Sequence, residues 1–121
     1  MGLFLKNISL KGKTALVTGA TKGLGRGAAE AIAEAGGNVI AIGRNQKELN
    51  SLGKTIKRYR VKYTSFNSDV NNFNRMKNFI IKLKKLDILV NNAGTNIPES
   101  FLKVKKSSLE KLLNVNTKAM F

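Results

Sequence analysis

The chain has 121 residues, and its 22 lysines and arginines outweigh 7 aspartates and glutamates to give a formal net charge of +15. This length fits one domain, residues 1–121, large enough to bury roughly two thirds of its unfolded surface. Cysteine and histidine are absent, so disulfides and a conventional zinc site are excluded and we expect no bound metal.

Charge and hydropathy also limit the partners of the chain. No apolar run approaches the roughly 18 residues of a membrane helix, and the N-terminus has no cleavage pattern of a secretory signal. The lysines are spread over several predicted elements and aromatic residues do not alternate with them, which favours a solvated surface over a nucleic-acid interface. We therefore expect a cytoplasmic protein that binds neither a membrane nor a specific nucleic acid.

The first predicted elements are a strand and a helix joined by a glycine-rich loop. The run TALVT, residues 14–18, is short and nearly all apolar, as is typical of a strand buried on both faces. Residues 24–35 follow as a helix that ends at Gly36 and Gly37. Its apolar stripe consists of Leu24, Ala28, Ala31, Ile32 and Ala35.

The alternation of strand and helix continues along the chain. In order, the hydrophobic pattern predicts a strand at 38–43, a helix at 46–58, a strand at 61–66, a helix at 71–84, a strand at 86–90 and a helix from 107 to the end. The stripe of the helix at 71–84 consists of Phe73, Met76, Ile80 and Leu83. Such alternation indicates an α/β fold, a doubly wound parallel sheet with helices on both faces that stops after about four strands and four helices.

The glycines after the first strand indicate a phosphate-binding loop. In LVTGATKGLGRG, residues 16–27, Gly19 follows the strand directly, and Gly23 and Gly25 fall where the helix begins. A helix N-terminus at the carboxyl ends of parallel strands offers unpaired N–H groups to a pyrophosphate. We prefer this frame to one that starts at Gly23, because the turn glycine should follow the strand at once. A tight strand-to-helix connection without a ligand is the alternative.

Four motifs in order carry a family resemblance. TGATKGLG and then NNAG at residues 91–94 resemble the short-chain dehydrogenase/reductase family, nicotinamide-dependent oxidoreductases of Rossmann fold. Two further segments resemble motifs of the same family, Asp69-Val70 after the third strand and NVNTKAMF at the chain end. The resemblance therefore covers essentially the whole chain. The segments GRNQKELN and NNAGTNIPESFLKV look most like members that reduce cyclic or sugar-derived ketones, such as tropinone reductases and sugar-acid dehydrogenases.

The resemblance implies a set of cofactor-binding residues. Asp69 would accept a hydrogen bond from the adenine amino group while Val70 packs against the ring, with a helix-capping Asp69 as the alternative. Small residues at 92–94 would lie beside a ribose, with a purely structural turn as the alternative. The expected set is Thr18, Gly19, Thr21, Lys22, Gly23, Leu24, Gly25, Arg44, Asp69, Val70, Asn92, Ala93 and Gly94.

Asn116 is the catalytic residue that the resemblance implies. Its amide lies on the apolar stripe of the last predicted helix, where an unpaired buried amide costs roughly 1–3 kcal/mol. In the family this position holds a proton-relay water, and a satisfied core asparagine is the alternative. The family's Tyr-x-x-x-Lys pair is missing, because the only tyrosines are Tyr59 and Tyr63 and neither precedes a lysine by four residues. We therefore expect a cofactor-binding half, either a truncated gene product or a sequence fragment, that is inactive alone.

The charge after the second strand indicates the cofactor. A site for NAD has a carboxylate there, whereas a site for NADP has an arginine. Arg44 occupies this place, the first acid after it is Glu48, and Lys22 would add a charge-assisted contact to a 2′-phosphate. We expect NADP rather than NAD, with merely solvated cations as the alternative.

Three functions remain open from the sequence. We favour a fragment of an NADP-dependent, homo-oligomeric oxidoreductase that transfers hydride between NADP(H) and a small-molecule ketone or secondary alcohol. The others are a non-catalytic nucleotide-binding module and a basic nucleic-acid-associated protein.

Overall fold

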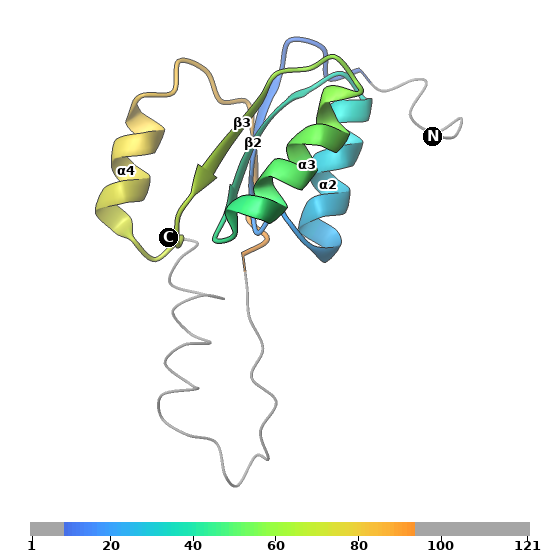
Figure 1. Ribbon diagram of the computed structural model, residues 1–121. Helices are drawn as coiled ribbons and strands as arrows, with labels where there is room; N and C mark the ends of the chain where they lie inside the picture. The colour runs from blue at the N-terminus through green and yellow to red at the C-terminus, as the bar shows by residue number, and fades with distance from the viewer. Residues whose placement is uncertain (1–8, 94–121) are drawn as a thin grey trace, which may run out of the picture.

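The computed structural model describes residues 9–93, in which a four-stranded parallel sheet forms the centre (Figure 1). The strands are β1 (Thr14–Thr18), β2 (Asn38–Gly43), β3 (Tyr63–Asn67) and β4 (Ile88–Val90). They lie in the order β3-β2-β1-β4, with Val17 opposite Ala41 on one side and Val90 on the other. The predicted parallel sheet is confirmed.

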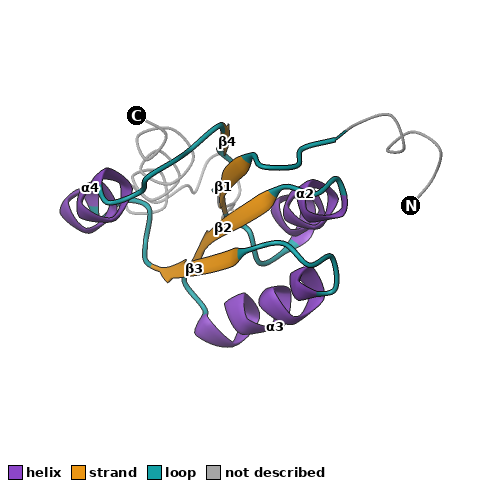
Figure 2. Cartoon of the chain, turned by 90° about the horizontal axis from the view of Figure 1, so that it is seen from above, coloured by secondary structure: helices purple, strands orange, loops and turns teal. Residues whose placement is uncertain are grey.

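Helices cover both faces of this sheet (Figure 2). They are α2 (Gly23–Glu34), α3 (Gln46–Lys57) and α4 (Phe73–Ile81). Helices α2 and α3 lie on one face and α4 on the other, which confirms the doubly wound arrangement. Within residues 9–93, no helix combines the length and the apolar character needed to cross a membrane.

The predicted stripe of helix α2 is confirmed only at its C-terminal end, where Ala35 is buried and Ile32 packs against the core. Leu24 is 86% exposed, so its predicted place on the buried face is wrong. The buried residues are Gly25, Ala29 and Ala33, and the last two pack with Val17 and Ala41 of the sheet. Small side chains at every fourth position bring this helix close to the strands. Alanine occurs at several positions of this helix, so the hydrophobic pattern did not show which of them face the sheet.

The predicted buried face of helix α4 is confirmed in part. Phe73 is 64% and Ile80 is 42% exposed, so these two were wrongly assigned to the buried face. Met76 and Leu83 cover the sheet as predicted, together with Phe79. Phe79 stacks on Phe66 of β3 with 4.1 Å between ring centroids. Apolar residues on two adjacent stripes make either face plausible from sequence, and the aromatic contact selects one. The helix predicted from residue 107 lies outside the described residues.

Asp87 joins the start of β4 to β1. Its carboxylate accepts a hydrogen bond from the backbone N–H of Thr14 at 2.9 Å, and its own N–H donates to the carbonyl of Thr14 at 2.9 Å. The N–H of Thr14, followed by the charges of Lys85 and Lys13, lowers the pKa of Asp87. A carboxyl group whose pKa is lower in the folded state stabilises the fold above its unfolded pKa.

We therefore expect Asp87→Asn to be less stable than the wild type at neutral pH. The folded pKa of Asp87 lies below its unfolded value, so this contribution is present above about pH 4 and is lost as the pH falls through the folded pKa. Chemical unfolding of both proteins across this range should show that the difference in their unfolding free energies decreases toward acid pH. An equal gap in unfolding free energy at all pH values would contradict this role.

Candidate cofactor-binding site

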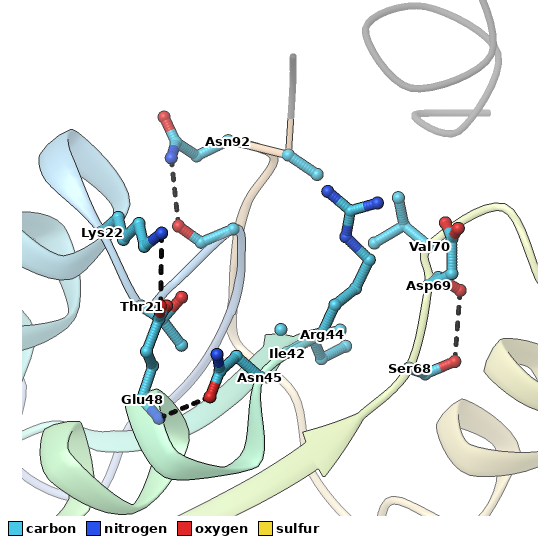
Figure 3. Close-up of a pocket in the computed structure, with 13 residues that line it drawn as sticks. Thr21, Lys22, Ile42, Arg44, Asn45, Glu48, Ser68, Asp69, Val70 and Asn92 are labelled. Atoms are coloured by element: carbon cyan, nitrogen blue, oxygen red, sulfur yellow. Dashed lines mark hydrogen bonds and ion pairs between the residues drawn. The ribbon is translucent and has the colours of Figure 1, made fainter. Parts of the chain in front are cut away.

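A pocket of about 570 Å³ opens at the carboxyl ends of the strands (Figure 3). The predicted site residues that line it are Gly19, Thr21, Lys22, Arg44, Asp69, Val70, Asn92 and Ala93. Residues that line it without having been predicted are Ile42, Gly43, Asn45, Glu48 and Ser68. The topology thus brings the loops after β1, β2, β3 and β4 to one place, as expected for a doubly wound sheet.

Gly19 lets the loop after β1 pass against the segment after β4. Its φ is +60°, and a Cβ here would lie 2.9 Å from the carbonyl oxygen of Asn92 and 3.1 Å from Cα of Ala93. The side-chain amide of Asn92 donates to the carbonyl of Gly19 at 3.3 Å. The two loops therefore form one wall of the pocket, with little room for a side chain between them.

Gly23 and Gly25 differ in what surrounds them, and neither lines the pocket. Gly23 begins α2 with a φ of +55°, and no atom of the described residues lies within 4 Å of a Cβ added there. A Cβ on Gly25 would lie 2.0 Å from the carbonyl oxygen of Gly19 and 2.5 Å from Nδ2 of Asn92. Gly25 thus serves the close packing of the helix on the loop.

The N-terminus of α2 has no side-chain cap. Lys22 occupies the N-cap position without a capping hydrogen bond, and the first turn contains no acidic residue. The N–H groups of a first helical turn have no partner within the helix, and the helix dipole makes this end positive. This end of α2, at the Lys22 side of the pocket, is suited to receive an anion.

Thr18 lies behind the pocket and holds its wall. The residue is 6% exposed, and its hydroxyl accepts hydrogen bonds from the N–H groups of Asn92 at 3.0 Å and Ala93 at 3.1 Å. The same hydroxyl donates to the carbonyl of Val90 at 3.4 Å. Thr18 therefore positions the segment after β4. Leu24, also predicted for the site, projects away into solvent, while Gly94 and Asn116 lie outside the described residues.

Asp69 and Val70 form the wall opposite the glycine-rich loop (Figure 3). The carboxylate of Asp69 accepts from the N–H of Asn71 at 2.9 Å, within a turn. The helix cap of α4 is Asn72, whose side chain accepts from the N–H of Arg75 at 3.3 Å. The alternative in which Asp69 caps this helix is therefore wrong. The hydroxyl of Ser68 donates to the carbonyl of Asp69 at 3.1 Å and fixes the turn.

Two cationic side chains line the pocket, and they differ in whether they have a partner among the described residues. Arg44 follows β2 directly and is exposed, and within the described part of the chain its side chain has no ion-pair or hydrogen-bond partner. Lys22 places its Nζ 3.2 Å from Oε1 of Glu48. A hydrogen bond from Thr21 is the main cause of the lowered pKa of Glu48, and Lys22 lowers it further.

Glu48 is the pocket residue that the sequence analysis should have found. Asn45 accepts from the N–H of Glu48 at 3.1 Å and caps α3. An Asn followed three residues later by a Glu is a recognisable capping pattern before a helix. Together with the helix predicted at 46–58, this pattern would have assigned Glu48 to the capped N-terminus that faces the site.

A doubly wound sheet with a glycine-rich loop leading into a helix defines a Rossmann-type α/β domain. The chain belongs to the short chain dehydrogenase family, whose model matches residues 13–121. The resemblance seen in TGATKGLG and NNAG is thereby confirmed.

Several named proteins of this family are similar to the chain. The 3-oxoacyl-(acyl-carrier-protein) reductase of Rickettsia conorii is 38% identical over 114 residues, which cover 94% of this chain and 46% of that protein. A tropinone reductase homolog of Arabidopsis thaliana is 33% identical over 121 residues, covering 96% of this chain and 46% of that protein. The structure of a short-chain dehydrogenase from Sphingobium yanoikuyae in complex with NADPH superposes with a TM-score of 0.81 at 26% identity, covering 89% of this chain and 44% of that one. The chain thus spans about half the length of the relatives it matches.

Proposed function

We propose that the pocket binds the adenosine half of NADP(H), and that residues 1–121 form a nucleotide-binding domain of an oxidoreductase acting on a ketone or secondary alcohol. When bound, the cofactor supplies or accepts the hydride. The observation that carries the proposal is Arg44, a cation directly after β2 that has no partner among residues 9–93, at the place where a site for NAD has a carboxylate. The complex of the Sphingobium yanoikuyae relative with NADPH supports the same cofactor.

The described residues fit the parts of this cofactor. The uncapped N-terminus of α2 suits a pyrophosphate, and Arg44 with Lys22 suits a 2′-phosphate. On the opposite wall, Val70 offers an apolar surface to the adenine ring, and Asp69 an acceptor for its amino group. Each element of the pocket then serves a chemically matching part of one ligand.

The remaining assignments extend the proposal beyond the described residues. Gly94 would continue the cofactor wall, and Asn116 would hold a catalytic water in the assembled active site. We also propose a homo-oligomer located in the cytoplasm, with no nucleic-acid or membrane partner.

Replacement of Arg44 tests the cofactor preference. We expect Arg44→Ala to weaken NADP⁺ binding by about tenfold, because a charge-assisted hydrogen bond to the 2′-phosphate is lost. NAD⁺ lacks this phosphate, so its affinity should change by less than about twofold. Titration calorimetry with each cofactor measures both values.

Lys47→Ala is the matched control, since it removes an equal charge from the first turn of α3 at a residue that does not line the pocket. Its affinities should equal those of the wild type. Equal wild-type affinities for the two cofactors, with no effect of Arg44→Ala, would overturn the proposed function.

A further inference from the structure

Glu48 places a negative charge among the groups proposed to bind a phosphate. Its Oε1 lies 3.2 Å from Nζ of Lys22, and the hydroxyl of Thr21 lowers the pKa of its carboxyl group. Figure 3 shows Glu48 extending from the first turn of α3 to meet Lys22 and Thr21, while Arg44 projects separately into the pocket. One of the two cations is therefore already neutralised by a residue of the protein itself.

The carboxylate of Glu48 is held in its charged form. The hydrogen bond from Thr21 and the charge of Lys22 both lower its pKa, and the N-terminal turn of α3 favours a negative charge. The side chain of Lys22 is 80% exposed and that of Glu48 is 29% exposed. The pair is accordingly weak enough to be broken by a stronger anion, because exposed ion pairs contribute little free energy.

On the basis of the proposed NADP site, we propose that Glu48 is a specificity-determining residue that competes with the 2′-phosphate of the cofactor for Lys22 and Thr21. A bound 2′-phosphate must displace the carboxylate from Lys22 and then lies beside a like charge. The 2′-hydroxyl of NAD has no charge to repel and donates a hydrogen bond that a carboxylate accepts. Glu48 thereby reduces the discrimination against NAD that Arg44 provides.

A neutral side chain of the same shape tests this competition. We expect Glu48→Gln to bind NADP⁺ roughly three- to fivefold more tightly than the wild type, as an exposed ion pair no longer has to be broken. NAD⁺ binding should stay equal or become slightly weaker. Titration calorimetry of the whole chain with NADP⁺ and with NAD⁺ gives both affinities without recourse to enzyme activity.

Glu30→Gln is the matched control. Glu30 also forms an ion pair at the surface, with Arg26 at 3.2 Å and both side chains partly exposed, and it does not line the pocket. The substitution makes the same change in net charge, so a general charge effect would raise the NADP⁺ affinity in both variants. We expect the affinity of Glu30→Gln to equal that of the wild type, and an equal gain in the two variants would overturn the inference.

A double-mutant cycle separates competition for Lys22 from simple repulsion. In a Lys22→Met background, Glu48→Gln should improve NADP⁺ binding clearly less than in the wild-type background, because the repulsion of the phosphate is still relieved but no cation remains to be released. A gain as large as in the wild-type background would overturn competition for Lys22. If Arg44→Ala removes the NADP⁺ preference but Glu48→Gln changes nothing, this inference fails and the proposed function stands. If the wild type shows no dependence on Arg44, the proposed function itself fails.

Discussion

Gly25→Ala is expected to lower the free energy of unfolding by about 3 kcal/mol. The added Cβ would lie 2.0 Å from the carbonyl oxygen of Gly19 and 2.5 Å from Nδ2 of Asn92. The nearest of these atoms belongs to the backbone, so relief requires α2 to move away from the loop after β1. We expect the same movement to disturb the hydrogen bond between Asn92 and Gly19, and with it one wall of the pocket. Chemical unfolding followed by circular dichroism measures the loss.

Gly27→Ala provides the control on the same helix. Gly27 is exposed and helical, and within residues 9–93 nothing lies within 4 Å of a Cβ added there. An alanine in a helix interior is favoured over glycine, so this variant should gain about 0.5–1 kcal/mol. Equal stability changes in the two variants would show that the close approach at Gly25 is relieved without cost.

The strands of the sheet could be predicted best where they are fully buried. The predictions for β1 and β2 match the structure residue for residue, because each is an apolar run between polar or glycine-containing loops. Strand β4 was predicted from residue 86, but Leu86 and Asp87 lie outside it. Among the described residues it lies at an edge of the sheet and pairs only with β1. Side-chain pattern alone does not show where pairing at an edge stops.

The buried face of α3 follows from its large apolar side chains, but the faces of α2 and α4 could not be derived in this way. On α2 the contact surface runs through Gly25, Ala29 and Ala33, and the pattern does not distinguish these residues from the other alanines of the helix. On α4 the stacking of Phe79 on Phe66 decides between two apolar stripes. Both outcomes depend on the distance between helix and sheet, which is a tertiary property.

The candidate site also combines features that the sequence predicts with features that only the fold shows. The sequence located the loop through Gly19 and the cation Arg44, since both depend only on their place after a strand. The ion pair of Lys22 with Glu48 joins two loops far apart in the chain, so only the fold shows that they meet. Sequence spacing also did not distinguish Gly23, with open space around it, from Gly25, whose surroundings leave no room for a methyl group.

Thr18→Val is expected to lower the free energy of unfolding by about 2 kcal/mol. Valine has nearly the shape of threonine, so it fills the space of this 6% exposed side chain but removes the hydroxyl. The N–H groups of Asn92 and Ala93 then lose their acceptor, and the carbonyl of Val90 loses a donor. A partly buried N–H without an acceptor costs more than the hydrogen bond contributed, because water does not fully replace the partner.

The same substitution should also affect the pocket, because the hydroxyl of Thr18 holds the segment that contributes Asn92 and Ala93 to its wall. We expect NADP⁺ to bind about three- to tenfold more weakly to Thr18→Val. Without the hydroxyl, the segment after β4 is no longer held in place, so binding has to supply the free energy of ordering it. Thr18→Ser retains the hydroxyl and loses only a methyl group, so it should keep the cofactor affinity and lose about 1 kcal/mol or less of stability. Chemical unfolding and titration calorimetry on the two variants separate the hydroxyl from the methyl group. If serine and valine weaken folding and binding equally, the packing of the methyl group, and not the three hydrogen bonds, holds the loop after β4 against β1.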